Sequence, residues 1–289
     1  MGLRRSLLFV PGNNPGMVQN AGVLGADTVI LDLEDAVAPS EKDAARVLLA
    51  QALKTVDYGN CEIAIRINSL DSFAQEDLAM LVPLSPNAIM VPKVNTADDI
   101  KQVAQWLQQY EVAGGRCVEI IALIETPVGI ANCMQIAAAH ERLTALAFGA
   151  EDYTAGLGAQ RTKEGQEILT ARCLLANAAA AYSIQALDTP FTDVNDDEGL
   201  KKDVALSRQL GFKGKLSINP RHIEAIHEGF TPTAREINWA RRVLEIIKEA
   251  EEQGAGVVAL DGKMIDKPIV DRAKHLLQTA EALGVGGKI

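Results

Sequence analysis

The sequence predicts an α/β fold, a (β/α)8 TIM barrel with a C-terminal helical extension. Short segments rich in aliphatic and β-branched residues alternate with amphipathic segments from residue 6 to about residue 230. Parallel strands need a crossover between them, usually a helix, so a series of eight strand–helix units favours one parallel sheet. Eight units in this length also match the usual size of a closed barrel. An open doubly wound sheet is the alternative fold.

The predicted strands are short apolar runs that end on polar residues. Their length and their β-branched content favour strands over buried helices. The glycines of PGNNPG at 11–16 do not have the spacing of a dinucleotide-binding motif. In chain order the strands are SLLFVPG (6–12), DTVILDLED (27–35), CEIAIRIN (61–68), AIMVPKV (88–94), EIIALIET (119–126), ALAFGAED (145–152), QALDTPF (185–191) and KLSINP (215–220).

Amphipathic segments between these runs predict the crossover helices. Apolar residues recur in them at helical spacing. They include SEKDAARVLLAQALK (40–54), ADDIKQVAQWLQQY (97–110), PVGIANCMQIAAAH (127–140) and EGQEILTARCLLANAAAAY (164–182).

After residue 230 the alternation of strands and helices ends. We therefore expect a catalytic barrel over residues 1–230 and a helical extension over 231–289. A long helix is predicted over 231–254 with Thr233 as its N-cap, then a glycine-rich aliphatic piece and a polar turn, and a last helix from about Pro268. The extension is too short for a large core of its own. We expect it to serve as a lid and to pack on the barrel or on a neighbouring subunit.

Composition excludes several classes of function. The 289 residues carry a net charge of −10 with dispersed acids, whereas a nucleic-acid binder needs a basic face. No apolar run reaches the roughly 18 residues of a membrane-spanning helix, and the N-terminus lacks the apolar core of a signal peptide. We expect a cytoplasmic protein without a membrane or nucleic-acid partner. The four cysteines and four histidines show no metal-binding or nucleophile pattern.

Polar residues stand at nearly every predicted strand end. In a TIM barrel these ends form one mouth, where the chemistry takes place. A ring of charges there must be balanced internally or by a ligand. The ring consists of Asn13 and Asn14, Asp32, Glu34 and Asp35, Arg66 and Asn68, Lys93, Glu125, Glu151 and Asp152, Asp188, and Asn219.

Glu125 and Asp152 end neighbouring strands and could share one divalent ion. Ligation by oxygen alone favours Mg²⁺, with Mn²⁺ able to substitute. Two protein carboxylates leave coordination positions for water and substrate. Arg66 could hold a substrate carboxylate through two parallel hydrogen bonds.

Structural roles compete with these interpretations. Asp35 could simply cap a helix, and Glu34 could pair with a barrel arginine. Lys93 could act on substrate electrostatically, form a buried ion pair, or serve as a Schiff-base lysine.

Several motifs, in order along the chain, resemble a known family. RRSLLFVPGNNPGM, GADTVILDLEDAV, IRIN, ALIETPVGI, GAEDYTAGLGAQRT, LGFKGKLSINPRHI and GKMIDKPIVDRA lie between about residues 4 and 275. Together they resemble the citrate lyase-like and malyl-CoA lyase-like aldolases, and among these the citrate lyase β subunits (citryl-ACP lyases).

The resemblance implies a (β/α)8 barrel that requires Mg²⁺ and forms a homo-oligomer, a trimer or hexamer. It implies that Glu125 and Asp152 bind the metal and that Arg66 binds the oxo-acid carboxylate. Asp266 would enter the active site of an adjacent subunit as general acid/base. Glu34 would line the site together with Asp32, and the resemblance leads us to expect Glu34 and Arg66, with Asp266, among the catalytic residues. Backbone N–H groups would also bind the acid, at Gly149, Ala150 and Glu151.

The implied reaction is carbon–carbon cleavage of a 3-hydroxyacyl thioester by retro-aldol (retro-Claisen) chemistry. Citryl-ACP, giving oxaloacetate and acetyl-ACP, is the favoured substrate, and further lyase subunits could be partners. Citramalyl-CoA, malyl-CoA and citryl-CoA are alternatives within the family. A Schiff-base aldolase acting through Lys93 or Lys215 and a non-catalytic assembly subunit are alternatives outside this chemistry.

Overall fold

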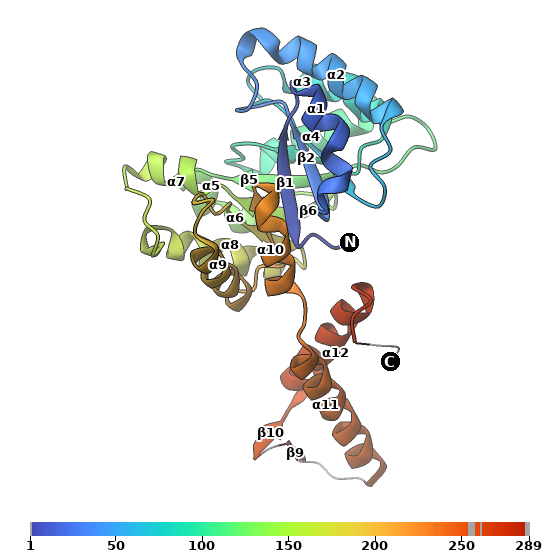
Figure 1. Cartoon of the computed structure of the whole chain (residues 1–289), viewed down its shortest axis with the longest axis vertical. Helices are drawn as coiled ribbons and strands as arrows, with labels where there is room; N and C mark the ends of the chain where they lie inside the picture. Colours follow the sequence, from blue (N-terminus) through green and yellow to red (C-terminus); the bar gives the residue numbers. More distant parts are fainter. Residues whose placement is uncertain (1, 254–257, 261, 287–289) are drawn as a thin grey trace. The chain divides into compact units, whose positions relative to one another are not determined.

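The computed structural model describes residues 2–253, 258–260 and 262–286, shown in Figure 1. The chain divides into two compact units. The first extends to His227, and the second begins at Glu228.

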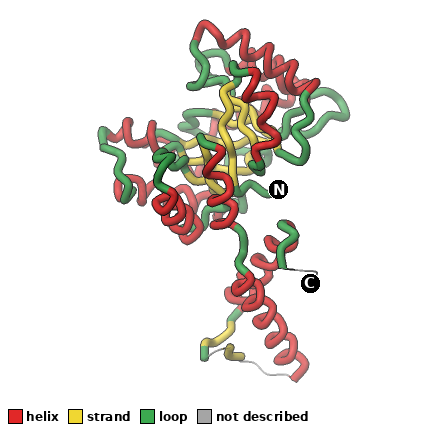
Figure 2. Tube along the Cα trace, in the orientation of Figure 1, coloured by secondary structure: helices red, strands yellow, loops and turns green. Residues whose placement is uncertain are grey.

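The first unit contains a closed barrel of eight parallel strands in chain order, with β1 paired to β8. This confirms the predicted TIM barrel and excludes the open sheet. The strands lie together in the centre of this unit in Figure 2. They are β1 (Ser6–Pro11), β2 (Thr28–Asp32), β3 (Glu62–Arg66), β4 (Ala88–Val91), β5 (Glu119–Ile124), β6 (Leu143–Phe148), β7 (Gln185–Asp188) and β8 (Gly214–Ser217).

Several predicted strands continue past the observed ladder. Glu34, Asn68 and Glu125 lie beyond the last residues of β2, β3 and β5. β6 begins at Leu143, earlier than predicted. These three polar side chains therefore belong to the loops at the mouth, while the ladder itself is almost wholly buried.

Apolar side chains fill the barrel, so it encloses a packed core rather than a pore. Residues two apart on one strand point to the same side, which explains the pairs Ile121 with Leu123 and Ala145 with Ala147. Phe9 of β1 packs against this core. The remaining members are Leu7, Ile30, Ala64, Ala88, Met90, Leu187 and Leu216.

Local sequence explains most helix boundaries. α4 begins where predicted because Thr96 and Asp99 form a reciprocal capping box. The predicted single helix over 127–140 is wrong. It breaks at Asn132, whose side-chain amide donates 2.9 Å to the Asn95 carbonyl. The helices up to residue 230 are α1 (Pro15–Asn20), α2 (Lys42–Thr55), α3 (Ala74–Leu81), α4 (Ala97–Tyr110), α5 (Pro127–Ala131), α6 (Cys133–Ala137), α7 (Ala150–Leu157), α8 (Gln166–Ala181), α9 (Asp197–Gln209) and α10 (Ile223–Phe230).

The second unit consists of two helices and a short hairpin. These are α11 (Ala234–Gln253), β9 (Val258–Leu260), β10 (Lys263–Ile265) and α12 (Lys267–Ala282). The Thr233 N-cap is confirmed, because its hydroxyl accepts from Glu236 N–H at 3.2 Å. The antiparallel β9–β10 pair replaces the expected irregular piece and turn, of which 254–257 and 261 lie outside the described residues.

This unit has its own small apolar core between α11, α12 and the hairpin. The fully buried members include Ala240 and Val243 of α11 and Ala273 of α12. No helix in the described part of the chain is both long and apolar enough to cross a membrane.

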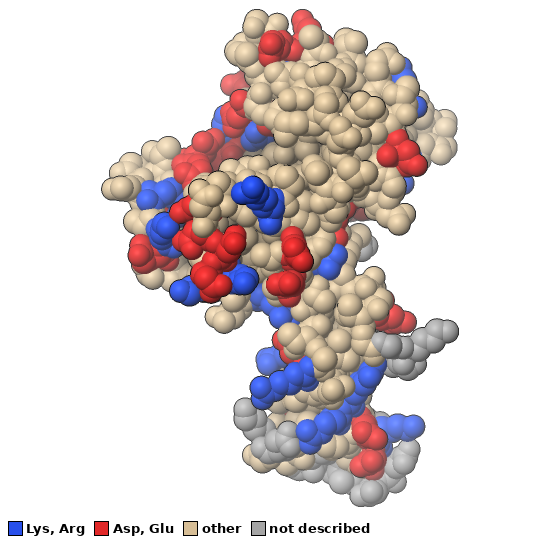
Figure 3. All heavy atoms as spheres, viewed as in Figure 1, with Lys and Arg blue, Asp and Glu red and all other residues tan. Residues whose placement is uncertain are grey.

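Charges are mixed over the face shown in Figure 3, where acidic side chains lie next to basic ones. Ion pairs of this kind include Lys163, which is 2.9 Å from Asp193 and 3.0 Å from Asp196.

Candidate active site

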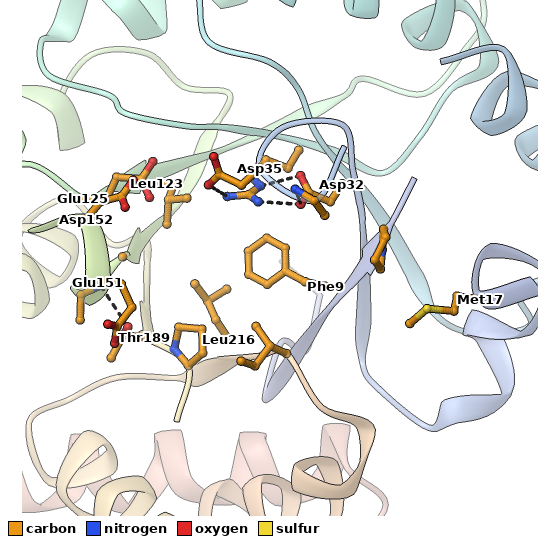
Figure 4. A pocket seen from close by; sticks show the side chains of 17 residues that line it. Phe9, Met17, Asp32, Asp35, Leu123, Glu125, Glu151, Asp152, Thr189 and Leu216 are labelled. Carbon is orange, nitrogen blue, oxygen red and sulfur yellow. Dashed lines mark hydrogen bonds and ion pairs between the residues drawn. The ribbon is translucent and has the colours of Figure 1, made fainter. Parts of the chain in front are cut away.

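A cavity of about 500 Å³ opens at the carboxyl ends of the barrel strands (Figure 4). One side is polar and the other is apolar. The polar lining consists of Asp32, Asp35, Arg66, Glu125, Glu151, Asp152 and Thr189. The apolar lining includes Phe9, Pro11, Met17, Leu123, Pro190, Leu216 and Ile218.

Glu125 follows directly after β5 and is only 5% exposed. Its Oε1 accepts a hydrogen bond of 2.9 Å from the Lys93 backbone N–H. Burial raises the pKa of Glu125 to about 8, and the nearby charges of Glu34 and Asp152 add to the rise. An ionised Glu125 is therefore costly unless a cation compensates it.

Gly149 makes room for the Glu125 carboxylate. A Cβ at this position would lie 2.6 Å from Glu125 Cβ and 2.7 Å from Oε2. Gly149 is also the N-cap of α7, and Asp152 lies in the first turn of that helix. The close approach of β5 and β6 thus places Glu125 beside Asp152, as the close-up in Figure 4 shows. The structure brings the two predicted metal ligands together.

Arg66 ends β3 and is held by a set of carboxylates. Its Nε and Nη2 donate to the two oxygens of Asp32, at 2.7 and 2.6 Å. Its Nη1 lies 2.9 Å from Glu34 Oε2 and 3.3 Å from Asp35 Oδ2. The guanidinium carbon lies 4.9 Å from the centre of the Phe9 ring. Asp32 therefore occupies one of the two edges of Arg66 that can form a pair of parallel hydrogen bonds.

Glu34 lies next to Arg66 but does not line the cavity, and it is only 5% exposed. Its Oε1 accepts 2.8 Å from Lys93 Nζ. Burial raises the pKa of Glu34 despite these two cations. The structural alternative, in which Glu34 pairs with a barrel arginine, is what the contacts show. A catalytic role for Glu34 stays a prediction.

The backbone donors predicted at 149–151 are partly used within the protein. Gly149 N–H donates 3.0 Å to the Ile124 carbonyl, and Ala150 N–H donates 3.1 Å to Thr189 Oγ1. Of the three backbone amides predicted to bind the substrate acid, only that of Glu151 is therefore still available. The Glu151 carboxylate pairs with Arg161 at 3.2 Å. Gly149, Ala150 and Glu151 still line the cavity.

Asp188 does not join the ring at the mouth as expected. It is fully buried and accepts from Arg172 Nη2 at 2.8 Å and from Lys215 Nζ at 3.0 Å. Lys215 is also fully buried and lies 2.6 Å from Asp203. A lysine enclosed by two carboxylates is a poor Schiff-base nucleophile, so this alternative loses its support at Lys215.

Asp266 belongs to the second unit, where its side chain caps α12 by accepting 3.3 Å from Ile269 N–H. Its predicted role in an adjacent subunit stays a prediction. Within the described residues, no group of three or more His, Cys, Asp or Glu side chains is arranged to hold a metal ion.

The sequence analysis did not predict three features of the site: the presence of Phe9, the space that Gly149 leaves for Glu125, and the presence of Thr189. Thr189 directly follows the strand-end Asp188, and its alternation to the other side of the strand was an available signal. Nothing in the local sequence revealed that Phe9 lies under Arg66.

A model of the HpcH/HpaI aldolase/citrate lyase family matches residues 5–220. The chain belongs to this family. The predicted family and the predicted class of enzyme, a carbon–carbon lyase, are thereby confirmed.

Citrate lyase β subunits are among the proteins to which this chain is similar. That of Haemophilus influenzae is 46% identical over 98% of both chains. That of Leuconostoc mesenteroides subsp. cremoris is 44% identical over 97% of this chain and 94% of the relative. A mitochondrial citramalyl-CoA lyase of Rattus norvegicus is 32% identical over 97% of this chain and 87% of the relative.

Solved structures of the CitE protein of Mycobacterium tuberculosis share the fold. A complex with magnesium, acetoacetate and coenzyme A has a TM-score of 0.78 and 31% identity, covering 96% of this chain and 98% of that one. A citrate lyase β subunit from the same organism, complexed with oxaloacetate and magnesium, has a TM-score of 0.68 and 31% identity, covering 80% of this chain and all of that one.

Proposed function

We propose that the protein is a magnesium-dependent lyase that cleaves citryl-ACP into oxaloacetate and acetyl-ACP. The observation that carries the proposal is the pairing of Glu125 and Asp152 beside Arg66 in one cavity. The similarity to citrate lyase β subunits over nearly the whole chain supports the choice of substrate.

The carboxylates fit a divalent cation. Glu125 is buried, its pKa is raised, and its nearest charged neighbours include the acids Glu34 and Asp152. Arg66 forms its direct ion pairs with other acids, and although its charge lowers the pKa of Glu125 somewhat, burial and the two acids outweigh it. Oxygen ligands suit Mg²⁺, and Mn²⁺ can replace it. When bound, the cation would supply a Lewis acid that polarises the oxygen of the hydroxy or oxo acid.

Arg66 would bind the substrate carboxylate from a fixed position. Asp32 holds the guanidinium plane from one edge and Phe9 lies against its face, which removes rotamer freedom before substrate arrives. Nη1 of Arg66 also lies 2.9 Å from the buried Glu34 carboxylate. Its contact with Asp35 is the one that a ligand could replace, because the Asp35 side chain is 60% exposed and can move aside. The Glu151 amide would add a backbone donor.

The apolar side of the cavity would take the thioester part of the substrate. Met17 and Ile218 are 43% and 51% exposed, although both are large apolar residues. Covering them with an acyl thioester would remove apolar surface from water.

Cleavage requires the substrate hydroxyl to lose a proton while the carbon–carbon bond breaks. The bonding electrons pass to the carbon next to the thioester carbonyl and form an enolate, whose α-carbon then takes a proton to give the acetyl thioester. We assign both proton transfers to Asp266 of an adjacent subunit in a homotrimer or hexamer. General acid–base catalysis of this kind contributes roughly 10²–10⁴-fold. Association with other lyase subunits and a cytoplasmic location belong to the same proposal.

A second candidate within this chemistry is citramalyl-CoA or malyl-CoA cleavage. Its support is the 32% identity to citramalyl-CoA lyase. The 34% identity to a (3S)-malyl-CoA thioesterase of Cereibacter sphaeroides supports malyl-CoA as a ligand, since that relative is named for hydrolysis rather than carbon–carbon cleavage.

A panel of thioesters tests the proposal. Citryl, citramalyl and malyl groups, each on carrier protein and on CoA, are assayed with Mg²⁺ and with excess chelator. We expect the highest kcat/KM with citryl-ACP and no turnover in chelator. Full activity in chelator, or a covalent adduct trapped by borohydride, would contradict the mechanism.

A further inference from the structure

Lys93 has an unusual backbone conformation at the edge of the site. Its φ is 51°, and the only other non-glycine residues with positive φ in the described part of the chain are Ser85 and Ser183. This left-handed region is unfavourable for residues with a side chain. Such conformations persist where surrounding contacts fix them, often at functional sites.

Because of this left-handed conformation, two consecutive backbone amides donate hydrogen bonds to two different acceptors. Lys93 N–H donates 2.9 Å to Glu125 Oε1. The next amide, that of Val94, returns to the barrel and donates 3.2 Å to the Leu123 carbonyl. On its other side the Glu125 carboxylate has Oε2 against Gly149, at the start of the helix that carries Asp152. One oxygen of Glu125 is thus bound by Lys93, which leaves the other facing α7.

The side chain of Lys93 makes a second, separate contact. Its ammonium donates 2.8 Å to Glu34 Oε1, while the other Glu34 oxygen lies 2.9 Å from Arg66 Nη1. The Glu34 side chain is 6% exposed and that of Lys93 is 42% exposed. The ammonium is therefore the solvent-facing end of a chain of charges that runs through Glu34 to Arg66.

We propose that Lys93 is a positioning residue with two separable parts: a backbone that orients the metal-binding carboxylate of Glu125, and an ammonium that fixes Glu34 and, through it, Arg66. The inference rests on the proposed function, because it assigns Glu125 to the cation and Arg66 to the substrate carboxylate. It leaves no role for Lys93 as a Schiff-base nucleophile, since the ammonium is held in an ion pair.

Two substitutions separate the parts. Lys93→Gly removes the ammonium but favours the left-handed backbone, so it keeps the N–H bond to Glu125. Lys93→Val removes the ammonium and also disfavours that backbone, because β-branched residues rarely adopt it. The difference between the two variants isolates the backbone part. Lys93→Arg keeps a cation and tests rescue of the side-chain part.

Mg²⁺ affinity by titration calorimetry and steady-state kinetics on citryl thioester are the two readouts. For Lys93→Gly we expect a Mg²⁺ Kd within about threefold of the parent, with KM raised and kcat lowered about tenfold. Glu34 loses the ammonium and can then shift against Nη1 of Arg66, although Asp32 still holds the other edge of the guanidinium. For Lys93→Val we expect a Mg²⁺ Kd at least about tenfold weaker, the size typical for loss of a contact that orients a metal ligand. Lys93→Arg is expected to recover kcat to within about threefold of the parent.

Ser183 supplies the matched control. It has φ 57°, is exposed, and precedes β7 at the opposite end of the barrel from the mouth. Ser183→Val and Ser183→Gly should shift the melting temperature in the same directions as the Lys93 pair and leave Mg²⁺ affinity and kinetics unchanged.

The outcomes are distinguishable. If the parent protein binds Mg²⁺ and Lys93→Val binds it as tightly as Lys93→Gly, the backbone part of the inference is wrong. If Lys93→Gly keeps the parental kcat and KM, the side-chain part is wrong. A parent that binds no Mg²⁺ and cleaves no thioester overturns the proposed function itself, and this inference with it.

Discussion

At the scale of single residues, the site depends on the close approach of β5 and β6 beside the Glu125 carboxylate. Glu125 is buried and lies against Gly149, where any Cβ would meet it at 2.6 Å. This contact does not use a left-handed backbone, since Gly149 has φ −104°. The glycine is needed for space.

Gly149→Ala should therefore push the Glu125 carboxylate out of place. We expect Mg²⁺ affinity to weaken by at least about tenfold and the free energy of unfolding to fall by about 1–3 kcal/mol. Calorimetric Mg²⁺ titration and denaturant unfolding measure the two effects. Gly16→Ala, where a Cβ would meet only Asn14 at 3.6 Å, is the control. Unchanged Mg²⁺ affinity in Gly149→Ala would show that Glu125 tolerates displacement.

Neutral isosteres test the two proposed metal ligands. Glu125→Gln and Asp152→Asn should each lower kcat/KM by at least about 10²-fold and weaken Mg²⁺ binding, because each removes a charged oxygen ligand. Glu125→Gln should not destabilise the apoprotein, because Gln keeps an acceptor for the Lys93 N–H and cannot ionise in its buried position. Asp98→Asn, on the exposed face of α4, is the control. Wild-type Mg²⁺ affinity in either variant would remove that residue from the proposed site.

The raised pKa of Glu125 predicts a pH dependence of stability. Its folded pKa of about 8 lies above the reference value of 4.5, so the folded apoprotein binds this proton more tightly than the unfolded chain. The stabilising contribution is complete below pH 4.5 and is lost as the pH rises through 8. Saturating Mg²⁺ should remove this loss, because it stabilises the ionised form.

Thermal unfolding between pH 5 and 9, with and without Mg²⁺, measures the effect, and Glu125→Gln is the matched control. The parent minus Glu125→Gln difference in melting temperature should decline with rising pH only in the absence of Mg²⁺. A flat difference in both series would mean that Glu125 ionises normally.

At the scale of elements, the start of α7 is attached to the end of β7. Ala150 N–H donates to Thr189 Oγ1, and this bond is buried. Helix N-termini leave amides without partners inside the helix, so an external acceptor fixes where the helix begins. Asp152, in the first turn of α7, depends on that placement.

Thr189→Val should leave the buried Ala150 amide without its acceptor. We expect a loss of about 1–3 kcal/mol in unfolding free energy and a weaker Mg²⁺ affinity, because α7 is no longer held in place. Thr189→Ser keeps the hydroxyl and should behave like the parent in Mg²⁺ binding. Equal Mg²⁺ affinity in the Val and Ser variants would show that the bond does not position Asp152.

At the scale of the whole molecule, the proposed chemistry divides between two chains. Glu125 lies in the barrel unit, and Asp266 caps a helix of the second unit. If Asp266 acts on a neighbouring subunit, a site needs an intact Glu125 from one chain and an intact Asp266 from another.

Mixing two inactive variants tests this arrangement. Glu125→Gln and Asp266→Asn, each inactive alone, are unfolded, combined in equal amounts and refolded. In a cyclic oligomer with random assembly, about a quarter of the sites have an intact pair, so about a quarter of the parental activity should return. Activity that never exceeds that of the separate variants would confine each site to one chain.

Much of this protein could be read from the sequence, because local chemistry repeats along the chain. The alternation of apolar strands and amphipathic helices determined the barrel. Thr233 marked a helix start, because its cap involves only residues three positions apart in the chain. The acids at 125 and 152 could be assigned to one mouth, since the carboxyl ends of parallel strands meet there.

Only the tertiary structure decided which strand-end groups face the cavity and which are already bound. Asp188 turns inward to Arg172 and Lys215, and Asp32 occupies one edge of Arg66, the residue expected to hold the substrate carboxylate. The left-handed backbone conformation of Lys93 could not be predicted from the sequence either. These outcomes depend on contacts between residues far apart in the chain, where close packing and the cost of buried charge select the partner, and a local sequence pattern carries no information about that choice.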